Sequence, residues 1–152
     1  MQAVEEFDRA LALNPNFALA HTFRSVALAY LGRTEEALVA METGARLGPR
    51  ELVAGAYNVM RAGCCFIDGR YRDGIGFARK AVQEAPTAIT SHRILIANLA
   101  QAGEIAEAKS AVTALRQLKP DITLAQITET VGYDREDDRR RWREAFRIAG
   151  LE

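Results

Sequence analysis

The chain has 152 residues, of which 49% are hydrophobic and 26% are charged, and this length and composition are typical of one folded domain rather than a disordered chain. Its 20 basic residues balance its 20 acidic residues, so no net charge attracts it to nucleic acid or to an anionic membrane. No apolar run reaches the roughly 18 residues of a membrane span, and no signal peptide begins the sequence. We therefore expect a cytoplasmic protein with neither a nucleic-acid nor a membrane partner.

The sequence repeats at a regular interval. Consecutive prolines are spaced by 34, 37 and 34 residues, at Pro15, Pro49, Pro86 and Pro120. The glycines that end apolar stretches are spaced by 37 and 34 residues, at Gly32, Gly69 and Gly103. Both sets place the same insertion in the second unit, so they support one internal repeat, which must be recognised before any fold is assigned.

In chain order, the pattern predicts a helix over residues 2–14 and then three pairs of helices. The pairs cover residues 18–32 and 33–49, 55–69 and 70–86, and 89–103 and 104–120. A glycine ends each first helix, because glycine accepts the left-handed conformation found there, and a proline follows each second helix. Thr34 is the expected N-cap of the helix over 33–49, with Glu35 and Glu36 in its first turn.

The pattern changes after Pro120. Residues 121–132 begin like another first helix, and residues 133–150 form a predicted final helix with Asp134 as a candidate cap. Acidic residues precede arginines in it, which suits the helix dipole. The expected i,i+4 ion pairs are Glu136–Arg140 and Asp137–Arg141. One apolar stripe faces away from these charges, formed by Trp142, Ala145, Phe146 and Ala149. We expect this helix to cap the end of a helix stack.

The repeat resembles the tetratricopeptide repeat family, a helix–turn–helix unit of 34 residues. The family's small residue in the second helix is matched by Ala3, Ala37, Gly74 and Ala108. The large position four residues later carries Phe7 and Met41 in the first two units and the smaller Ala78 and Val112 in the others. The family's tryptophan in the first helix is replaced by His21, Asn58 and His92. The resemblance covers roughly residues 1–122.

The resemblance implies an all-α solenoid, a right-handed superhelix with a C-terminal capping helix. Its parts are the second helix of a truncated repeat (1–17), three repeats (18–51, 52–88 and 89–122) and capping helices (123–152). Because the first helix of the opening repeat is missing, we expect the chain to be a fragment of a longer protein. The ending REAFRIAGLE resembles the close of repeat regions in multidomain bacterial signalling proteins, such as adenylate or guanylate cyclases and winged-helix regulators.

In the family, the first helices line a concave groove that receives a partner segment. The corresponding residues here are mainly apolar and small: Leu19, Thr22, Val26, Ala29, Tyr30, Val59, Gly63, Phe66, Ile67, Thr90, Arg93, Ala97 and Gln101. Such a groove suits an amphipathic helix, or it is filled by the chain's own C-terminal helix. We expect charge at Val59 or Phe66 to abolish partner capture without unfolding the domain.

The resemblance therefore implies a non-catalytic protein–protein interaction module within a larger cytoplasmic signalling protein. A homodimer through residues 2–14 or through the groove is the alternative. An enzyme is less well supported, because no nucleophile–base set is evident, and we expect no cofactor and no metal.

Arg24 and Arg61 stand where the family has leucine, so both are expected to be partly buried. A buried guanidinium must be paired. The partner is either an internal carboxylate, such as Glu36 or Asp73, or the carboxylate or phosphate of a bound ligand. An anion sensor is thus a further, less favoured function.

Other chemically suggestive residues have simpler structural interpretations. His21 and His92 lie two repeats apart, on the order of 20 Å, so they cannot share a metal. Cys64 and Cys65 fall inside a predicted helix, where cysteine packs as a small hydrophobe. Residues 73–80 contain two glycines, Gly74 and Gly76, which favour close helix packing over a phosphate loop. The arginines of residues 139–143 are balanced by nearby acids, which argues against a nucleic-acid patch.

Overall fold

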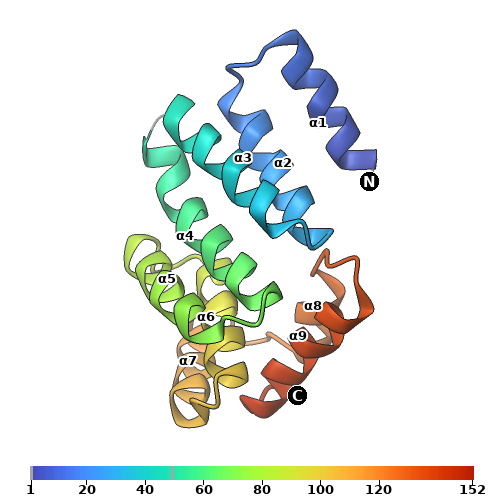
Figure 1. Ribbon diagram of the computed structural model, residues 1–152. Helices are drawn as coiled ribbons and strands as arrows, with labels where there is room; N and C mark the ends of the chain where they lie inside the picture. The colour runs from blue at the N-terminus through green and yellow to red at the C-terminus, as the bar shows by residue number, and fades with distance from the viewer. Residues whose placement is uncertain (1, 49) are drawn as a thin grey trace.

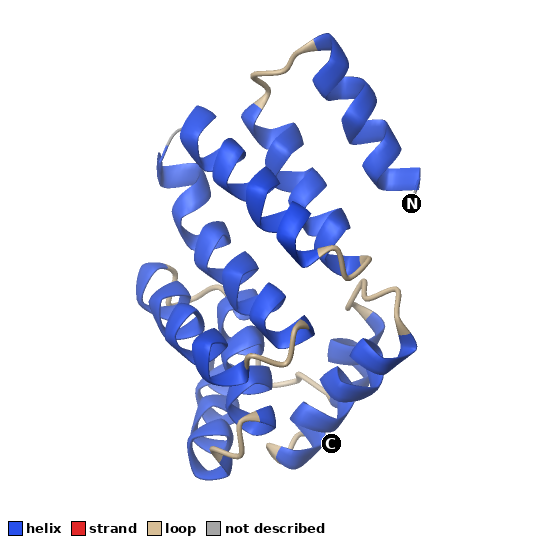
Figure 2. Cartoon of the chain, viewed as in Figure 1, coloured by secondary structure: helices blue, strands red, loops and turns tan. Residues whose placement is uncertain are grey.

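The computed structural model describes residues 2–48 and 50–152. Within these residues the chain is helical, with no strand (Figure 2), so the all-α prediction is confirmed. The helices are α1 (Gln2–Leu13), α2 (Ala18–Tyr30), α3 (Thr34–Leu47), α4 (Arg50–Ile67), α5 (Tyr71–Glu84), α6 (Ile89–Gln101), α7 (Ile105–Leu118), α8 (Leu124–Glu129) and α9 (Glu136–Ile148). Pro49, the expected end marker of one helix, lies outside the described residues.

Helices that follow one another in the chain pack side by side from α1 to α7, and the chain then turns back so that α9 packs on α6 and α8 (Figure 1). The second, fourth and sixth helices also contact one another in sequence, α2 with α4 and α4 with α6. Small residues permit the close approach of neighbours: Ala37, Ala78 and Ala108 are completely buried. We call residues 124–152, which contain α8 and α9, the C-terminal segment.

Glycine ends α2, α4 and α6 as predicted. Gly32, Gly69 and Gly103 all have positive φ, of 76°, 74° and 84°, a conformation that other residues rarely adopt. After Gly32, the amide of Arg33 donates a hydrogen bond to the carbonyl of Leu28 at 2.9 Å. This six-residue closure is the Schellman arrangement, and it satisfies a carbonyl that the helix end would leave unpaired.

Two histidines stabilise equivalent loops. The Nε2 atom of His21 lies 2.9 Å from the carbonyl oxygen of Pro15, and that of His92 lies 2.7 Å from the carbonyl oxygen of Pro86. Each contact spans six residues and ties the turn before a helix to the first turns of that helix. The two histidines therefore have the same structural role at two positions of the repeat.

The predicted helix caps were wrong. Arg33 and Arg135 precede α3 and α9, and neither makes a side-chain cap hydrogen bond. Thr34 is the first residue of α3 and not its cap, and its Oγ1 donates to Asp68 Oδ1 at 2.9 Å. The amide of Asp134 donates to the carbonyl of Tyr30 at 2.9 Å, which joins the C-terminal segment to the end of α2.

The short helix α8 begins with a capping box that the sequence analysis did not identify. Thr123 accepts a hydrogen bond from the amide of Gln126 at 3.3 Å, and the Gln126 side chain accepts one from the amide of Thr123 at 3.2 Å. The reciprocal pair satisfies two amides at the helix start. It fixes the point at which the chain leaves α7 and turns back.

Candidate functional site

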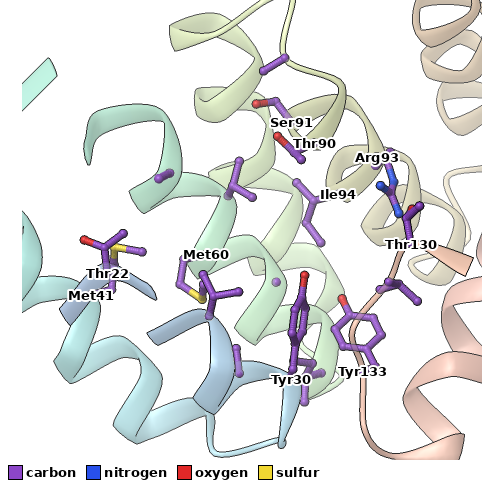
Figure 3. A pocket seen from close by; sticks show the side chains of 18 of the residues that line it. Thr22, Tyr30, Met41, Met60, Thr90, Ser91, Arg93, Ile94, Thr130 and Tyr133 are labelled. Atoms are coloured by element: carbon purple, nitrogen blue, oxygen red, sulfur yellow. The ribbon is translucent and has the colours of Figure 1, made fainter. Parts of the chain in front are cut away.

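A pocket of about 480 Å³ lies between α2, α4, α6 and residues 130–142 of the C-terminal segment (Figure 3). Nine of the thirteen expected groove residues line it: Thr22, Val26, Ala29, Tyr30, Val59, Gly63, Ile67, Thr90 and Arg93. The C-terminal segment supplies Thr130, Val131, Tyr133 and Trp142. The first helices thus form one side of the pocket, and the chain's own C-terminal segment closes another.

The remaining expected groove residues lie outside this pocket. Phe66 is 0% exposed, with its ring stacked on Tyr133 at 6.1 Å between centroids and edge-to-face with Trp142 at 5.5 Å. Gln101 donates from Nε2 to the carbonyl of Arg141 at 2.9 Å. The C-terminal segment therefore occupies part of the surface to which the sequence analysis assigned a partner.

The burial of Phe66 corrects one expectation. A glutamate at this position would place a carboxylate among aromatic rings with no access to water, at a cost of several kcal/mol. Phe66→Glu would therefore disrupt the fold and would not test partner binding. Val59 is only partly buried and lines the pocket, so a substitution there remains informative.

A charged cluster attaches the C-terminal segment to α4. Arg141 donates from Nη2 to the carbonyl of Ile67 at 2.9 Å and from Nη1 to the Tyr71 hydroxyl at 2.9 Å. Its guanidinium also pairs with Asp138, which is 1% exposed and accepts a second bond from Arg135 Nε at 2.6 Å. A cation at the carbonyl end of α4 interacts favourably with the helix dipole, so this contact holds the segment in place.

Arg93 is the charged residue of the pocket. Its Nη2 donates to the carbonyl of Ile127 at 2.8 Å, and its guanidinium lies 5.5 Å from the centroid of the Trp142 ring. Its Nε atom is buried and has no hydrogen-bond partner among the described residues. Burial lowers the pKa of Arg93, and the nearby ionisable groups that oppose this effect are Tyr30 and Tyr133.

Two tyrosines complete the polar part of the pocket. Tyr30 and Tyr133 meet edge-to-face with 5.6 Å between ring centroids, and both are drawn beside the cavity in Figure 3. Burial is the main cause of the raised pKa of Tyr133, so its hydroxyl stays protonated. Tyr30, Tyr133 and Arg93 are all hydrogen-bond donors. The pocket therefore combines an apolar lining with a small set of donors.

Arg24 and Arg61 do not line the pocket. Arg24 donates from Nε to Asp8 Oδ1 at 2.6 Å, which pairs α2 with α1, whereas Glu36 or Asp73 was the expected partner. Arg61 donates to the Tyr57 hydroxyl at 2.9 Å, and its guanidinium lies 4.6 Å from the centroid of the Phe77 ring. Cation–π contact with these rings occupies the Arg61 charge.

Cys64 and Cys65 lie in the protein interior, and Gly74 and Gly76 differ in how closely they are packed. Cys64 and Cys65 are both free and buried, and burial raises the pKa of Cys64 to about 12. A Cβ atom on Gly74 would lie 2.1 Å from Asn98 Oδ1, so close packing is confirmed there. A Cβ atom on Gly76 would meet nothing within 4 Å, so the same prediction was wrong for Gly76.

The arginines at 139–143 are largely engaged with neighbouring acids. Glu136 pairs with Arg139 at 2.7 Å and not with Arg140 as predicted, whereas Asp137 lies 3.7 Å from Arg141, in the expected i,i+4 position. Trp142 is buried and so does not stack on an external base.

Among the described residues, no cluster of three or more His, Cys, Asp or Glu side chains is placed to hold a metal ion, and no helix is long and apolar enough to cross a membrane. No protein-family model and no curated protein sequence matches the chain.

Tyr133 and Trp142 line the pocket, although neither was among the predicted site residues. The predicted apolar stripe that contains Trp142 is buried, but the surface that it covers depends on the turn between α8 and α9. Gly132 was the one sequence signal for this turn. A Cβ atom there would lie 2.5 Å from the Tyr30 ring, so a residue without a side chain is needed where the turn meets Tyr30.

Proposed function

We propose that the chain is a tetratricopeptide-type binding module, without catalytic activity, that holds an apolar side chain of a partner protein segment in the pocket between α2, α4 and α6. The repeated helix pairs, each first helix ended by a glycine with positive φ, support the family assignment. The pocket itself carries the functional proposal, because a largely apolar cavity on a protein surface usually has a binding role.

The shape of the open region defines how the partner binds. The C-terminal segment covers Phe66 and Gln101, so a long helix cannot follow all three first helices. Leu19 and Phe23, one turn apart on α2, remain 44% and 54% exposed, and Phe23 also lines the pocket. A partner segment therefore lies over α2 and inserts one anchor into the cavity, in the manner of helix-in-groove recognition.

Gly63 provides the sharpest test. It lines the pocket, and a Cβ atom there would meet nothing within 4 Å, so Gly63→Leu fills the cavity without a clash. Gly76→Leu is the matched control, because Gly76 also lies within a helix, has open space, and is not part of the pocket lining. Helix content and melting temperature establish that both variants fold.

The experiment uses the chain as bait in an extract of the source cells, with the captured protein identified by mass spectrometry and then purified. We expect its Kd to rise at least about tenfold for Gly63→Leu, since the apolar anchor loses its site, and to stay unchanged for Gly76→Leu. Equal binding by Gly63→Leu would place the partner elsewhere on the molecule.

Self-association is the second candidate, and the exposure of α1 favours it. Leu13 is 90% exposed at the end of α1, and an apolar side chain in water gains from pairing with a second copy. Light scattering over a concentration series distinguishes the candidates. Self-association requires a dimer that Leu13→Glu dissociates, whereas partner binding through the pocket leaves the chain monomeric.

The proposed setting is a larger cytoplasmic signalling protein. The buried free thiols of Cys64 and Cys65 suit a reducing compartment. No nucleic-acid or membrane contact is part of the proposal, because the chain's formal charges sum to +0.

A further inference from the structure

We propose that the pocket recognises a carboxylate attached to an apolar body, and that Arg93 is the residue that binds the carboxylate. This inference rests on the proposed function, because the ligand occupies the same pocket. It specifies the chemical class of the ligand, which the apolar lining alone does not define.

The first observation is the charge balance around Arg93. No carboxylate among the described residues lies within ion-pair distance of its guanidinium, whereas Arg24 and Arg141, also half-buried, pair with Asp8 and Asp138. A buried charge without a counter-ion is costly. An anionic ligand group would remove that cost.

The second observation is the unused hydrogen-bonding capacity. The Nη2 atom of Arg93 donates to the carbonyl of Ile127, whereas Nη1 makes no hydrogen bond among the described residues. The Nε atom also has no partner, but it is closed to solvent and so to a ligand. The lowered pKa of Arg93 has the same origin, namely burial without an acid nearby. The geometry leaves Nη1 free for a carboxylate, which guanidinium binds with charge-assisted hydrogen bonds.

The third observation is that two phenols, Tyr30 and Tyr133, line the same pocket as Arg93. In Figure 3, Arg93 lies next to Thr130, and Tyr30 and Tyr133 stand at the same side of the cavity. In the described part of the chain, no side-chain hydrogen bond engages either phenol. A carboxylate accepts several hydrogen bonds at once, so one such group can use the guanidinium and a hydroxyl together.

The remaining lining excludes strongly hydrated anions. The lining is mainly apolar and includes Val26, Val59 and Ile94, so a free phosphate or sulfate would lose its water there while most of its oxygens found no donor. A volume of about 480 Å³ lies within the range of small-ligand sites, roughly 300–1,000 Å³. The ligand is therefore an amphipathic monoanion, with its charge at Arg93 and its apolar body toward Val59.

The carboxylate has two possible sources: a free amphipathic acid, or an acidic side chain beside the apolar anchor of the partner segment. Octanoate and 1-octanol are matched probes for the first source. For the second, a short leucine-rich peptide with one central glutamate is compared with its glutamine counterpart. Trp142, the only tryptophan, lines the pocket, so its fluorescence reports binding of either kind.

The expected result is that the wild-type chain binds octanoate, or the glutamate peptide, at least about tenfold more tightly than its uncharged counterpart. This preference should disappear in Arg93→Gln. Gly63→Leu should weaken the binding of the charged and the uncharged probe equally, because it fills the cavity and retains Arg93. This variant therefore separates loss of the cavity from loss of the charge. If only one pair shows the preference, that pair identifies the source.

Two results would overturn the inference. If octanol and octanoate bind equally, and the two peptides do so as well, the pocket is apolar only, and the proposed function survives without a role for Arg93. If none of the four probes binds the wild-type chain, the pocket is not a carboxylate site. Arg93→Gln removes the hydrogen bond to the Ile127 carbonyl as well as the charge, so Arg93→Lys, which keeps the charge, is the second variant. If Arg93→Lys still binds the anionic probe more tightly than its uncharged counterpart, the effect of Arg93→Gln comes from the lost charge and not from a change in the fold.

Discussion

The rings of Phe66 and Trp142 meet edge-to-face with 5.5 Å between centroids, and this contact joins the end of α4 to the C-terminal segment. Both side chains are buried. Phe66 also contacts Tyr71 and Tyr133, so it is the centre of an aromatic cluster that depends on parts of the chain far apart in sequence. The position of the C-terminal segment, and with it one wall of the pocket, depends on this cluster.

Phe66→Ala should reduce the free energy of unfolding by about 3–5 kcal/mol, because it removes a fully buried ring and leaves a cavity. The emission of Trp142 should also shift to longer wavelength as the C-terminal segment loosens. Urea denaturation followed by tryptophan fluorescence measures both effects. A loss of less than about 1 kcal/mol would show that the cluster does not hold the segment.

Asp138→Asn should reduce the free energy of unfolding by about 3 kcal/mol, because a buried carboxylate would no longer neutralise Arg141 and Arg135. Asp137→Asn is the matched control. Asp137 lies in the same first turn of α9 but is exposed, and surface ion pairs contribute about 1 kcal/mol or less. Denaturant titration of the two variants tests the difference, and equal losses would contradict the role assigned to Asp138.

Gly74→Ala should destabilise the chain by about 1–3 kcal/mol, because the added methyl group meets the buried Asn98 side chain at 2.1 Å. Gly76→Ala should instead stabilise it by about 0.5–1 kcal/mol, the usual gain from replacing glycine within a helix where space is open. Thermal melting of the two variants provides the comparison. Stabilisation by both substitutions would show that Asn98 can move aside.

The thiol of Cys64 makes stability fall at high pH. Burial raises its pKa from 9.0 to about 12, so between these values the unfolded chain loses a proton that the folded chain keeps. The free energy of unfolding is therefore unaffected by this thiol below pH 9, and it decreases as the pH rises from 9 toward 12. Denaturant midpoints across this range should fall less steeply in Cys64→Ala. Rapid reaction of native Cys64 with a thiol reagent at pH 8 would show that the site is not closed.

Local signals in the sequence were sufficient for most of the helices. Gly32, Gly69 and Gly103 ended their helices as expected, because glycine has no Cβ atom and adopts positive φ without a steric penalty. The helix starts were predicted less well. Thr34 has the side chain of an N-cap, but α3 already begins at Thr34. Its hydroxyl donates to Asp68, 34 residues later, and sequence spacing gives no information about such a tertiary contact.

The candidate site was predictable only in part. Repeat register placed Val59, Gly63 and Arg93 on one surface, and all three line the pocket. Which part of that surface stays open depends on the turn before α9, where Asp134 bonds to Tyr30. That turn has no repeat counterpart, so no periodic signal could indicate that Phe66 would be covered and Val59 would not.

Many of the hydrogen bonds that attach the C-terminal segment end on backbone carbonyls. Arg141 donates to the carbonyl of Ile67, Gln101 to that of Arg141, and Arg93 to that of Ile127. A carbonyl is present whatever the side chain, so the accepting positions can change residue type during evolution while the bond is kept. Divergent relatives should therefore retain the donors Arg93, Gln101 and Arg141 more strictly than the residues that receive their bonds.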